Sequence, residues 1–223
     1  MKERPILFSG AMVRAILAGT KTQTRRVVKH CITGPNLPAN IFDWHHQKTG
    51  DWLGAHGGGI EFGMTSAARL CPYGQPGDRL YVREAWAFDE EDNRILYRSD
   101  DNEETKEWDQ ARAESGLSKY RWRPSIHMPR AVSRILLEIV SVRVERLQDI
   151  SDADAIAEGI ERNAEYPTLW KRGDLHGDQN IMKSTGFPKL AYRSIWEQIN
   201  GHESWSANPW IWVVEFKRVE VQP

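Results

Sequence analysis

The chain has 223 residues, 40% of them hydrophobic, so it can bury the core of one large domain or two small ones. Its 30 Lys and Arg residues balance 31 Asp and Glu residues, and the formal net charge of -1 excludes a global attraction to nucleic acid or membranes. The two cysteines, Cys31 and Cys71, are too few for a disulfide framework. Because no signal-peptide pattern or membrane-length apolar run is found, we expect a cytoplasmic protein without a membrane partner.

The first 28 residues predict a strand, a helix and a second strand. Residues 5–8 are apolar, as in a short buried strand, and Ser9 is a suitable N-cap for a helix over 11–18. Gly19 stands where the end of a helix favours glycine. Residues 20–28 are rich in Thr and end with two valines, which predicts a turn that leads into a strand.

Two insertions interrupt the next part of the core. Residues 29–75 are rich in Gly, Pro, Asn and His, and a structureless loop of that length is improbable in a compact domain, so we expect an inserted lobe with partial structure. Within it, residues 57–59 are three glycines and indicate a flexible hinge. The next predicted core segment consists of a turn at 76–78 and a strand over 79–86, in which apolar and polar residues alternate. Acidic residues around a short strand at 95–97 indicate a second, solvated insertion over 89–120.

The second half of the chain predicts the remaining core. Two prolines make 121–130 an extended, rigid loop, and 134–145 is the longest strand signal. A short helix opens at Ser151 and stops at Gly159, a third insertion covers 161–186, and a helix near 190–199 precedes a final strand over 210–216. This order predicts one α+β domain over 1–223, a small β-barrel with short helices at its mouth. Its core comprises about 1–28, 76–88, 121–160 and 187–223.

The run from Gly19 to Arg26 concentrates three cations and three hydroxyl groups. Such a turn can hold a phosphate or a polarised carbonyl, and a buried Lys can act as a base. On a regular strand Lys21 and Thr24 would point to opposite faces, so their convergence requires a turn or a bulge. The alternative is a solvated turn beside an edge-strand lysine.

These residues carry a resemblance to a known family. The run that begins Gly19-Thr20-Lys21-Thr22-Gln23-Thr24-Arg25 resembles the G-x-K-x-x-T-x-R signature of the ASCH domain family, which has a PUA-like fold. Residues 76–84 are similar to the G-D-x-L-x-V-x-E strand of that family, and the helix that ends at Ala157-Glu158-Gly159 and the strand over 210–216 follow in its order. The resemblance covers the core segments, and the larger Trp-rich form is similar to that carried by bacteriophages and prophages.

The resemblance implies a protein that binds a nucleoside or single-stranded nucleic acid in a groove at the barrel mouth. Some members of the family hydrolyse the amide of N4-acylated cytidine with a Lys, a Thr and a Glu, which correspond to Lys21, Thr24 and Glu158. Thr24 would attack or position the carbonyl, Lys21 would take its proton, and Glu158 would orient Lys21 or shuttle a proton. Other relatives bind RNA without catalysis or are ribonucleases, and both remain alternatives. No cofactor is implied.

A second patch interleaves aromatic and basic residues: Arg121, Trp122, Arg123 and His127 are suited to stacking on bases and contacting phosphates. The alternative is a rigid loop that packs Trp122 into the core. Further substrate-binding or nucleic-acid-binding candidates come from the two family motifs, namely Arg25, Arg26, Arg83 and Glu84. No metal is expected, because the spacing of the Cys and His residues at 31, 45, 46, 56 and 71 matches no zinc signature.

Overall fold

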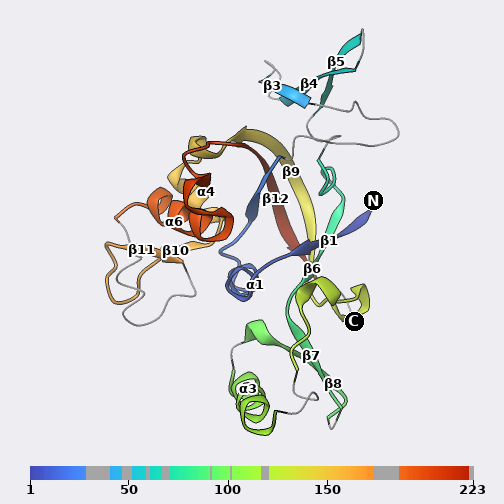
Figure 1. Ribbon diagram of the computed structural model, residues 1–223, viewed down its shortest axis with the longest axis vertical. Coiled ribbons are helices and arrows are strands. Elements are labelled where there is room, and N and C mark those ends of the chain that lie inside the picture. Colours follow the sequence, from blue (N-terminus) through green and yellow to red (C-terminus); the bar gives the residue numbers. More distant parts are fainter. Residues whose placement is uncertain are drawn as a thin grey trace.

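The computed structural model describes residues 1–28, 41–46, 52–58, 61–66, 71–90, 92–100, 102–116, 121–172 and 186–220. The described chain is an α+β structure built on a mixed five-stranded sheet with short helices. The sheet order is β1-β6-β9-β12-β2, comprising β1 (Glu3–Leu7), β6 (Arg79–Arg83), β9 (Leu136–Arg146), β12 (Trp210–Val219) and β2 (Gln23–Val27). β1 and β6 are parallel, and the other neighbours are antiparallel. Figure 1 shows the two long strands, β9 and β12, curving together through the centre of the molecule.

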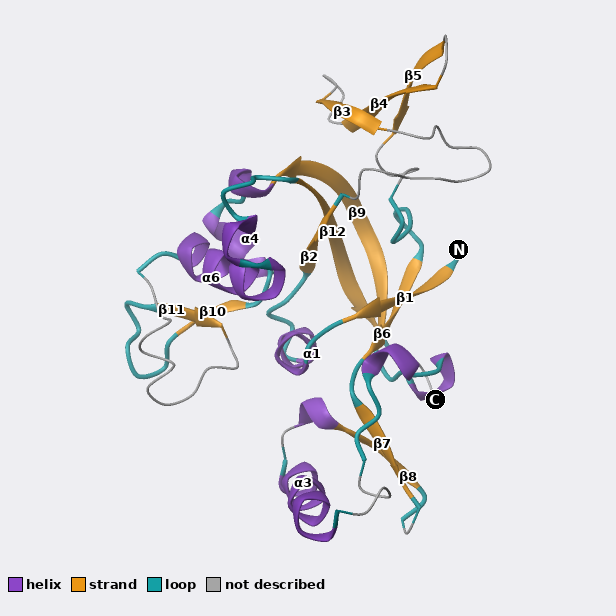
Figure 2. Ribbon diagram, in the orientation of Figure 1, coloured by secondary structure: helices purple, strands orange, loops and turns teal. Residues whose placement is uncertain are grey.

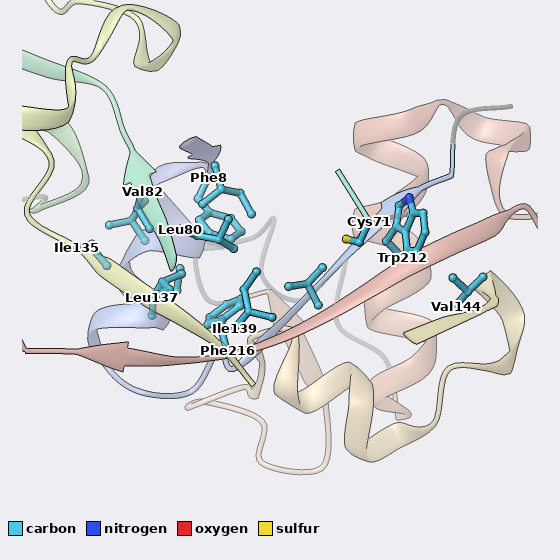
Figure 3. Close-up of a cluster of buried hydrophobic side chains, with 14 residues drawn as sticks. Phe8, Cys71, Leu80, Val82, Ile135, Leu137, Ile139, Val144, Trp212 and Phe216 are labelled. Carbon is cyan, nitrogen blue, oxygen red and sulfur yellow. The ribbon is translucent and has the colours of Figure 1, made fainter. Parts of the chain in front are cut away.

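Strand β12 separates two hydrophobic clusters, as the alternation of a strand requires. Trp212 and Val214 face the main core together with Phe8, Leu80 and Leu137, and Phe216 joins them after a bulge at Glu215/Phe216 (Figure 3). Ile211 and Val213 instead belong to a second cluster, which also contains side chains of α4 and α6. Burying each of these large side chains stabilises the fold by roughly 1.5–3 kcal/mol.

The helices begin and end at residues with identifiable roles. Helix α1 (Gly10–Leu17) starts at Ser9, whose hydroxyl accepts a hydrogen bond from the Met12 amide. Helix α4 (Asp152–Ala157) starts with a capping box between Ser151 and Asp154 and ends at Glu158. Helix α6 (Pro188–Asn200) has proline in its first turn and Gly201 after its last residue. Figure 2 shows α4 and α6 side by side next to strand β2.

The insertions carry structure of their own. The first contains the antiparallel sheet β3-β4-β5, formed by β3 (Ile41–His46), β4 (Trp52–Gly58) and β5 (Glu61–Ser66). Residues 57 and 58 lie in strand β4, so the hinge expected at the three glycines is wrong for these two positions. The third insertion contains a hairpin of β10 (Ile160–Arg162) and β11 (Trp170–Arg172).

The second insertion is a lobe that extends away from the sheet (Figure 1). It contains β7 (Trp86–Asp89), β8 (Arg94–Tyr97), the turn η1 (Arg98–Asp100) and α3 (Glu103–Ser115), with a small core formed by Ala87, Leu96, Trp108 and Trp122. The sequence did not predict α3, because its charged residues lack a clear apolar stripe. The predicted rigid loop over 121–130 contains the short turn η3 (Ser125–His127), and a second turn, η4 (Arg130–Val132), begins at its last residue. The remaining short turns are η5 (Leu147–Asp149) and η6 (His202–Ser204). None of the helices in the described ranges is long and apolar enough to cross a membrane.

Gly159 combines two constraints where α4 meets α1. Its φ is +95°, and a Cβ atom there would lie 3.2 Å from the Cβ of Ala15 and 3.5 Å from that of Lys21. Gly77 has a similar φ of +87°, but a Cβ atom there would meet nothing within 4 Å.

We expect Gly77→Ala to lower the free energy of unfolding by about 1–3 kcal/mol from backbone strain alone. In urea denaturation, Gly159→Ala should lower the free energy of unfolding by more than Gly77→Ala does, because Ala15 must also move. An equal or smaller loss would show that this close contact carries no penalty.

Candidate functional site

Lys21 lies in the turn between α1 and β2, and not on the strand that carries Thr24. Its amide donates to the Ala15 carbonyl at 3.1 Å, and it forms an isolated β-bridge with Glu158. The amide of Thr22 then donates to the Ala157 carbonyl at 2.9 Å. Burial does not alternate across this turn: Lys21 is buried, Thr22 is exposed, and the next three residues are all buried. The irregularity required for Lys21 and Thr24 to serve one site is therefore present.

Lys21 and Glu158 form a buried ion pair. The Lys21 ammonium lies 2.6 Å from Glu158 Oε2 and also donates to the Glu158 backbone carbonyl at 2.9 Å. The side chains are 0% and 5% exposed. Burial lowers the pKa of Lys21, and the attraction of Glu158 opposes that effect. The structure thus brings two of the three predicted catalytic residues into direct contact.

Arg25 joins this pair to a larger charge network. Its guanidinium lies 3.4 Å from Glu158, 2.7 Å from Glu145 and 3.4 Å from Asp154, and the side chain is fully buried. Gln23 donates to Asp154 as well, which fixes the start of α4 against β2. Because these partners occupy its terminal nitrogens, Arg25 acts within the network as a positioning residue for Glu158.

A cavity of about 230 Å³ opens beside this network. Thr24, Arg25 and Arg26 line it from strand β2, Glu158 lines it from the end of α4, and Tyr192 and Trp196 line it from α6. A smaller cavity of about 30 Å³ is lined by Glu158 and Tyr192 among others. Lys21 lines neither of these two cavities. Glu158 is therefore the member of the ion pair that faces them.

The lining of the larger cavity contains polar groups without partners. Within the ranges that the structure describes, Thr24 and Tyr192 make no side-chain hydrogen bond, and neither Trp196 Nε1 nor Arg25 Nε has a hydrogen-bond partner. All four residues are more than nine-tenths buried. An unmade buried hydrogen bond costs about 1–3 kcal/mol. The Trp196 and Arg25 nitrogens have no accessible surface, whereas the hydroxyls of Thr24 and Tyr192 are not sealed in this way. These two hydroxyls can donate to a ligand in the cavity, which indicates a ligand with carbonyl or other acceptor oxygens.

The remaining candidates from the family motifs have other partners. Arg26 lines the cavity, but its guanidinium also donates to the Leu7 carbonyl and lies over the Phe8 ring. Arg83 donates to the Met128 carbonyl at 2.9 Å and therefore anchors the 121–130 loop. Glu84 is fully buried and accepts from Ser99 and, through both carboxylate oxygens, from Arg134. Arg83 and Glu84 line neither cavity, and Glu84 joins the sheet to the lobe of residues 86–116 through Ser99.

The second predicted patch divides into buried and exposed residues. Trp122 is buried against Trp108, and its indole N–H donates to Asp109 at 2.7 Å, which favours a structural role over stacking on bases. Arg121, Arg123 and His127 are exposed. The Arg123 guanidinium lies 4.7 Å from the centre of the Trp86 ring, so it is partly engaged within the lobe. None of these residues lines either cavity.

Metal ligation is not indicated by the side chains that the structure describes. Across those ranges no group of three or more His, Cys, Asp or Glu residues is placed to hold an ion. Cys31 and the side chains of His45, His46 and His56 lie outside the described part of the chain. Cys71 is buried, and burial raises the pKa of its thiol to about 11, which makes it a poor ligand and nucleophile.

No protein-family model matches the chain, and neither the curated proteins nor the solved structures that were compared contain a match. The site is therefore interpreted from its own geometry.

Sequence reasoning missed the contribution of α6. The sequence predicts a helix near 190–199 but gives no signal that Tyr192 or Trp196 lines a site. The spacing of four residues shows that both lie on one helix face, but core residues have the same spacing. Likewise, Glu145 and Asp154 carried no local signal, since their connection to Arg25 arises from strand and helix packing.

The free energy of unfolding should depend on pH through Asp154. Hydrogen bonds from Ser151 and Gln23 and the nearby Arg25 hold the pKa of Asp154 at about 2, although burial opposes them, against an ordinary value of 3.8. A depressed carboxylate pKa contributes stability above the unfolded-state pKa, which is lost as pH falls from about 4 towards 2. Asp154→Asn should therefore flatten the fall in unfolding free energy over this window. Asp152→Asn removes a neighbouring charge from the same helix as a control, and equal pH profiles for the two variants would contradict the assignment.

The exposed arginines can be tested separately. Because the protein is nearly neutral, we expect weak binding to single-stranded RNA with a shallow salt dependence. Arg121→Ala combined with Arg123→Ala should weaken that binding in a fluorescence titration if the loop contacts phosphates. Unchanged affinity would assign these residues to structure alone.

Proposed function

We propose that this chain is an ASCH-type protein with a PUA-like barrel that binds a nucleoside in the larger cavity and hydrolyses the amide of N4-acylated cytidine. The observation that carries the proposal is the buried Lys21–Glu158 pair beside a cavity lined by the unpartnered hydroxyl of Thr24. An amine, a carboxylate and a hydroxyl are the groups that amide hydrolysis by a threonine requires. The curved five-stranded sheet and the order of the motifs support the fold assignment.

The size and lining of the cavity fit such a substrate. Its volume of about 230 Å³ is below the roughly 300–1,000 Å³ of sites for drug-sized ligands, so a single small ligand such as a nucleoside is favoured over a longer strand. The unpartnered donors match the carbonyl oxygens of an acylated cytosine, and Glu158 supplies an acceptor for its N–H group.

The geometry favours roles for Lys21 and Glu158 that differ from those implied by the family resemblance. Because Glu158 lines the cavity and Lys21 does not, Glu158 is the group that exchanges a proton with the substrate. Lys21 donates two hydrogen bonds to Glu158 and holds its carboxylate in place. Arg25 restrains the same carboxylate from the other side. Lys21 is thus a positioning residue in this mechanism.

The reaction then proceeds in two stages. Thr24 Oγ1 forms a bond to the amide carbon, the carbonyl π electrons move onto oxygen, and the hydroxyl proton passes to Glu158. The C–N bond breaks as Glu158 returns that proton to the exocyclic nitrogen, which releases cytidine. Water then hydrolyses the Thr24 ester, so that a carboxylic acid leaves and the hydroxyl is restored.

Variants of the three residues test this mechanism with N4-acetylcytidine, followed by chromatographic detection of cytidine. Glu158→Gln should lower kcat by at least ~100-fold through the loss of proton transfer. Thr24→Val should be inactive, while Thr24→Ser should retain part of the activity because its hydroxyl remains. Lys21→Met should lower kcat and reduce stability by about 3–5 kcal/mol, because it removes one partner of a buried pair.

Thr22→Val is the matched control, since Thr22 lies two residues from Thr24 with an exposed side chain, and it should keep wild-type activity. A wild-type protein that is inactive on a panel of acylated cytidines yet binds RNA tightly would contradict the proposal and favour a non-catalytic RNA-binding module. RNA cleavage that EDTA abolishes would favour a ribonuclease.

A further inference from the structure

Helix α6 contributes two aromatic residues to the lining of the larger cavity. Tyr192 and Trp196 are four residues apart, so they lie on one face of the helix, and their ring centroids are 6.2 Å apart. Both are buried, at 6% and 4% exposure. In the described part of the chain, the Tyr192 hydroxyl has no hydrogen-bond partner, and the Trp196 indole nitrogen is also unpartnered but has no accessible surface.

Packing holds these two rings in place. The Tyr192 ring lies 6.4 Å from that of Trp205, and the Arg25 guanidinium lies 6.0 Å from its centre. Tyr192 and Trp196 both belong to the hydrophobic cluster that α6 forms with Ile211 and Val213 of β12. Donors fixed in this way need no reorganisation when charge develops next to them.

We propose that Tyr192 donates a hydrogen bond that stabilises the oxyanion formed at the carbonyl oxygen of the substrate. The inference rests on the proposed amide hydrolysis and adds one catalytic residue to it. When Thr24 attacks, an electron pair moves from the C=O double bond onto oxygen, and the phenol proton remains on Tyr192 while it bonds to that oxygen. When the C–N bond breaks, the double bond re-forms and this hydrogen bond weakens.

Two further observations favour Tyr192. The terminal nitrogens of Arg25 already bond to carboxylates, which leaves only its Nε free among the described contacts of that side chain. Burial, followed by the negative charge of Glu158, raises the pKa of Tyr192 well above its ordinary value. The phenol therefore stays protonated, and remains a donor, at neutral and moderately alkaline pH.

The test is steady-state hydrolysis of N4-acetylcytidine by the full chain carrying Tyr192→Phe. This change keeps the ring and removes only the hydroxyl, so kcat should fall about 100-fold. KM should change little, because the carbonyl oxygen of the bound substrate is uncharged and negative charge develops on it only as the transition state is approached. Tyr97→Phe is the control: it also removes a part-buried phenol hydroxyl, which donates to the Val132 carbonyl at 2.8 Å in the lobe, and it should keep wild-type kcat.

Melting temperatures of all variants separate loss of fold from loss of catalysis. If Tyr192→Phe does not fold, Tyr192→Leu, which also removes the hydroxyl, carries the test with the same expected fall in kcat. An active wild type together with a folded Tyr192→Phe that keeps kcat within about threefold would overturn the oxyanion role and leave the proposed function standing. A wild type inactive on acylated cytidines would overturn both.

Discussion

The site depends on one buried charge pair, Lys21 with Glu158. A buried ammonium and carboxylate are each costly to desolvate, and they persist because they lie 2.6 Å apart and share further hydrogen bonds. The pair joins the turn after α1 to the end of α4, two segments separated by more than half of the chain. The positive φ of Gly159 lets the backbone turn there without a side chain that would press on Ala15. The Lys21–Glu158 contact fixes the position of Glu158, which forms part of the cavity wall.

The surrounding network explains how a polar site can lie between two hydrophobic clusters. Alternation along β12 sends Trp212 and Val214 to one cluster and Ile211 and Val213 to the other. Strand β2 pairs with this part of β12 and carries the buried Thr24 and Arg25 into the same region. Arg25 bonds to three carboxylates, so most of the charge is compensated locally, and Thr24 and Tyr192, whose hydroxyls have no partner among the described contacts, line the cavity.

The second insertion lies away from this site, whereas the β10–β11 hairpin of the third insertion lies next to it, with Trp170 packed against the cluster that contains Tyr192 and Trp196. The lobe of residues 86–116 forms an aromatic core with Trp122. It is joined to the rest of the chain through Ser99, which donates to Glu84, and through Asp100, which pairs with Arg134. One arginine of the predicted aromatic and basic patch is engaged there, because Arg123 lies over the Trp86 ring. Figure 1 shows this lobe, with β7, β8 and α3, extending away from α4 and α6.

The sequence by itself determined the local elements, because strand alternation, the serine caps and the glycines after helices are encoded over a few residues. It placed α1, β2, β9, α4, α6 and β12 close to their observed bounds and identified Lys21, Thr24 and Glu158 as candidates. It did not predict α3, whose residues have no clear apolar stripe. Only the tertiary structure decided that Glu158, and not Lys21, faces the cavity, and that Arg25 is occupied by Glu145 and Asp154. It alone brought Tyr192 and Trp196 to the cavity that Thr24 lines, because that arrangement arises from packing between segments far apart in the chain.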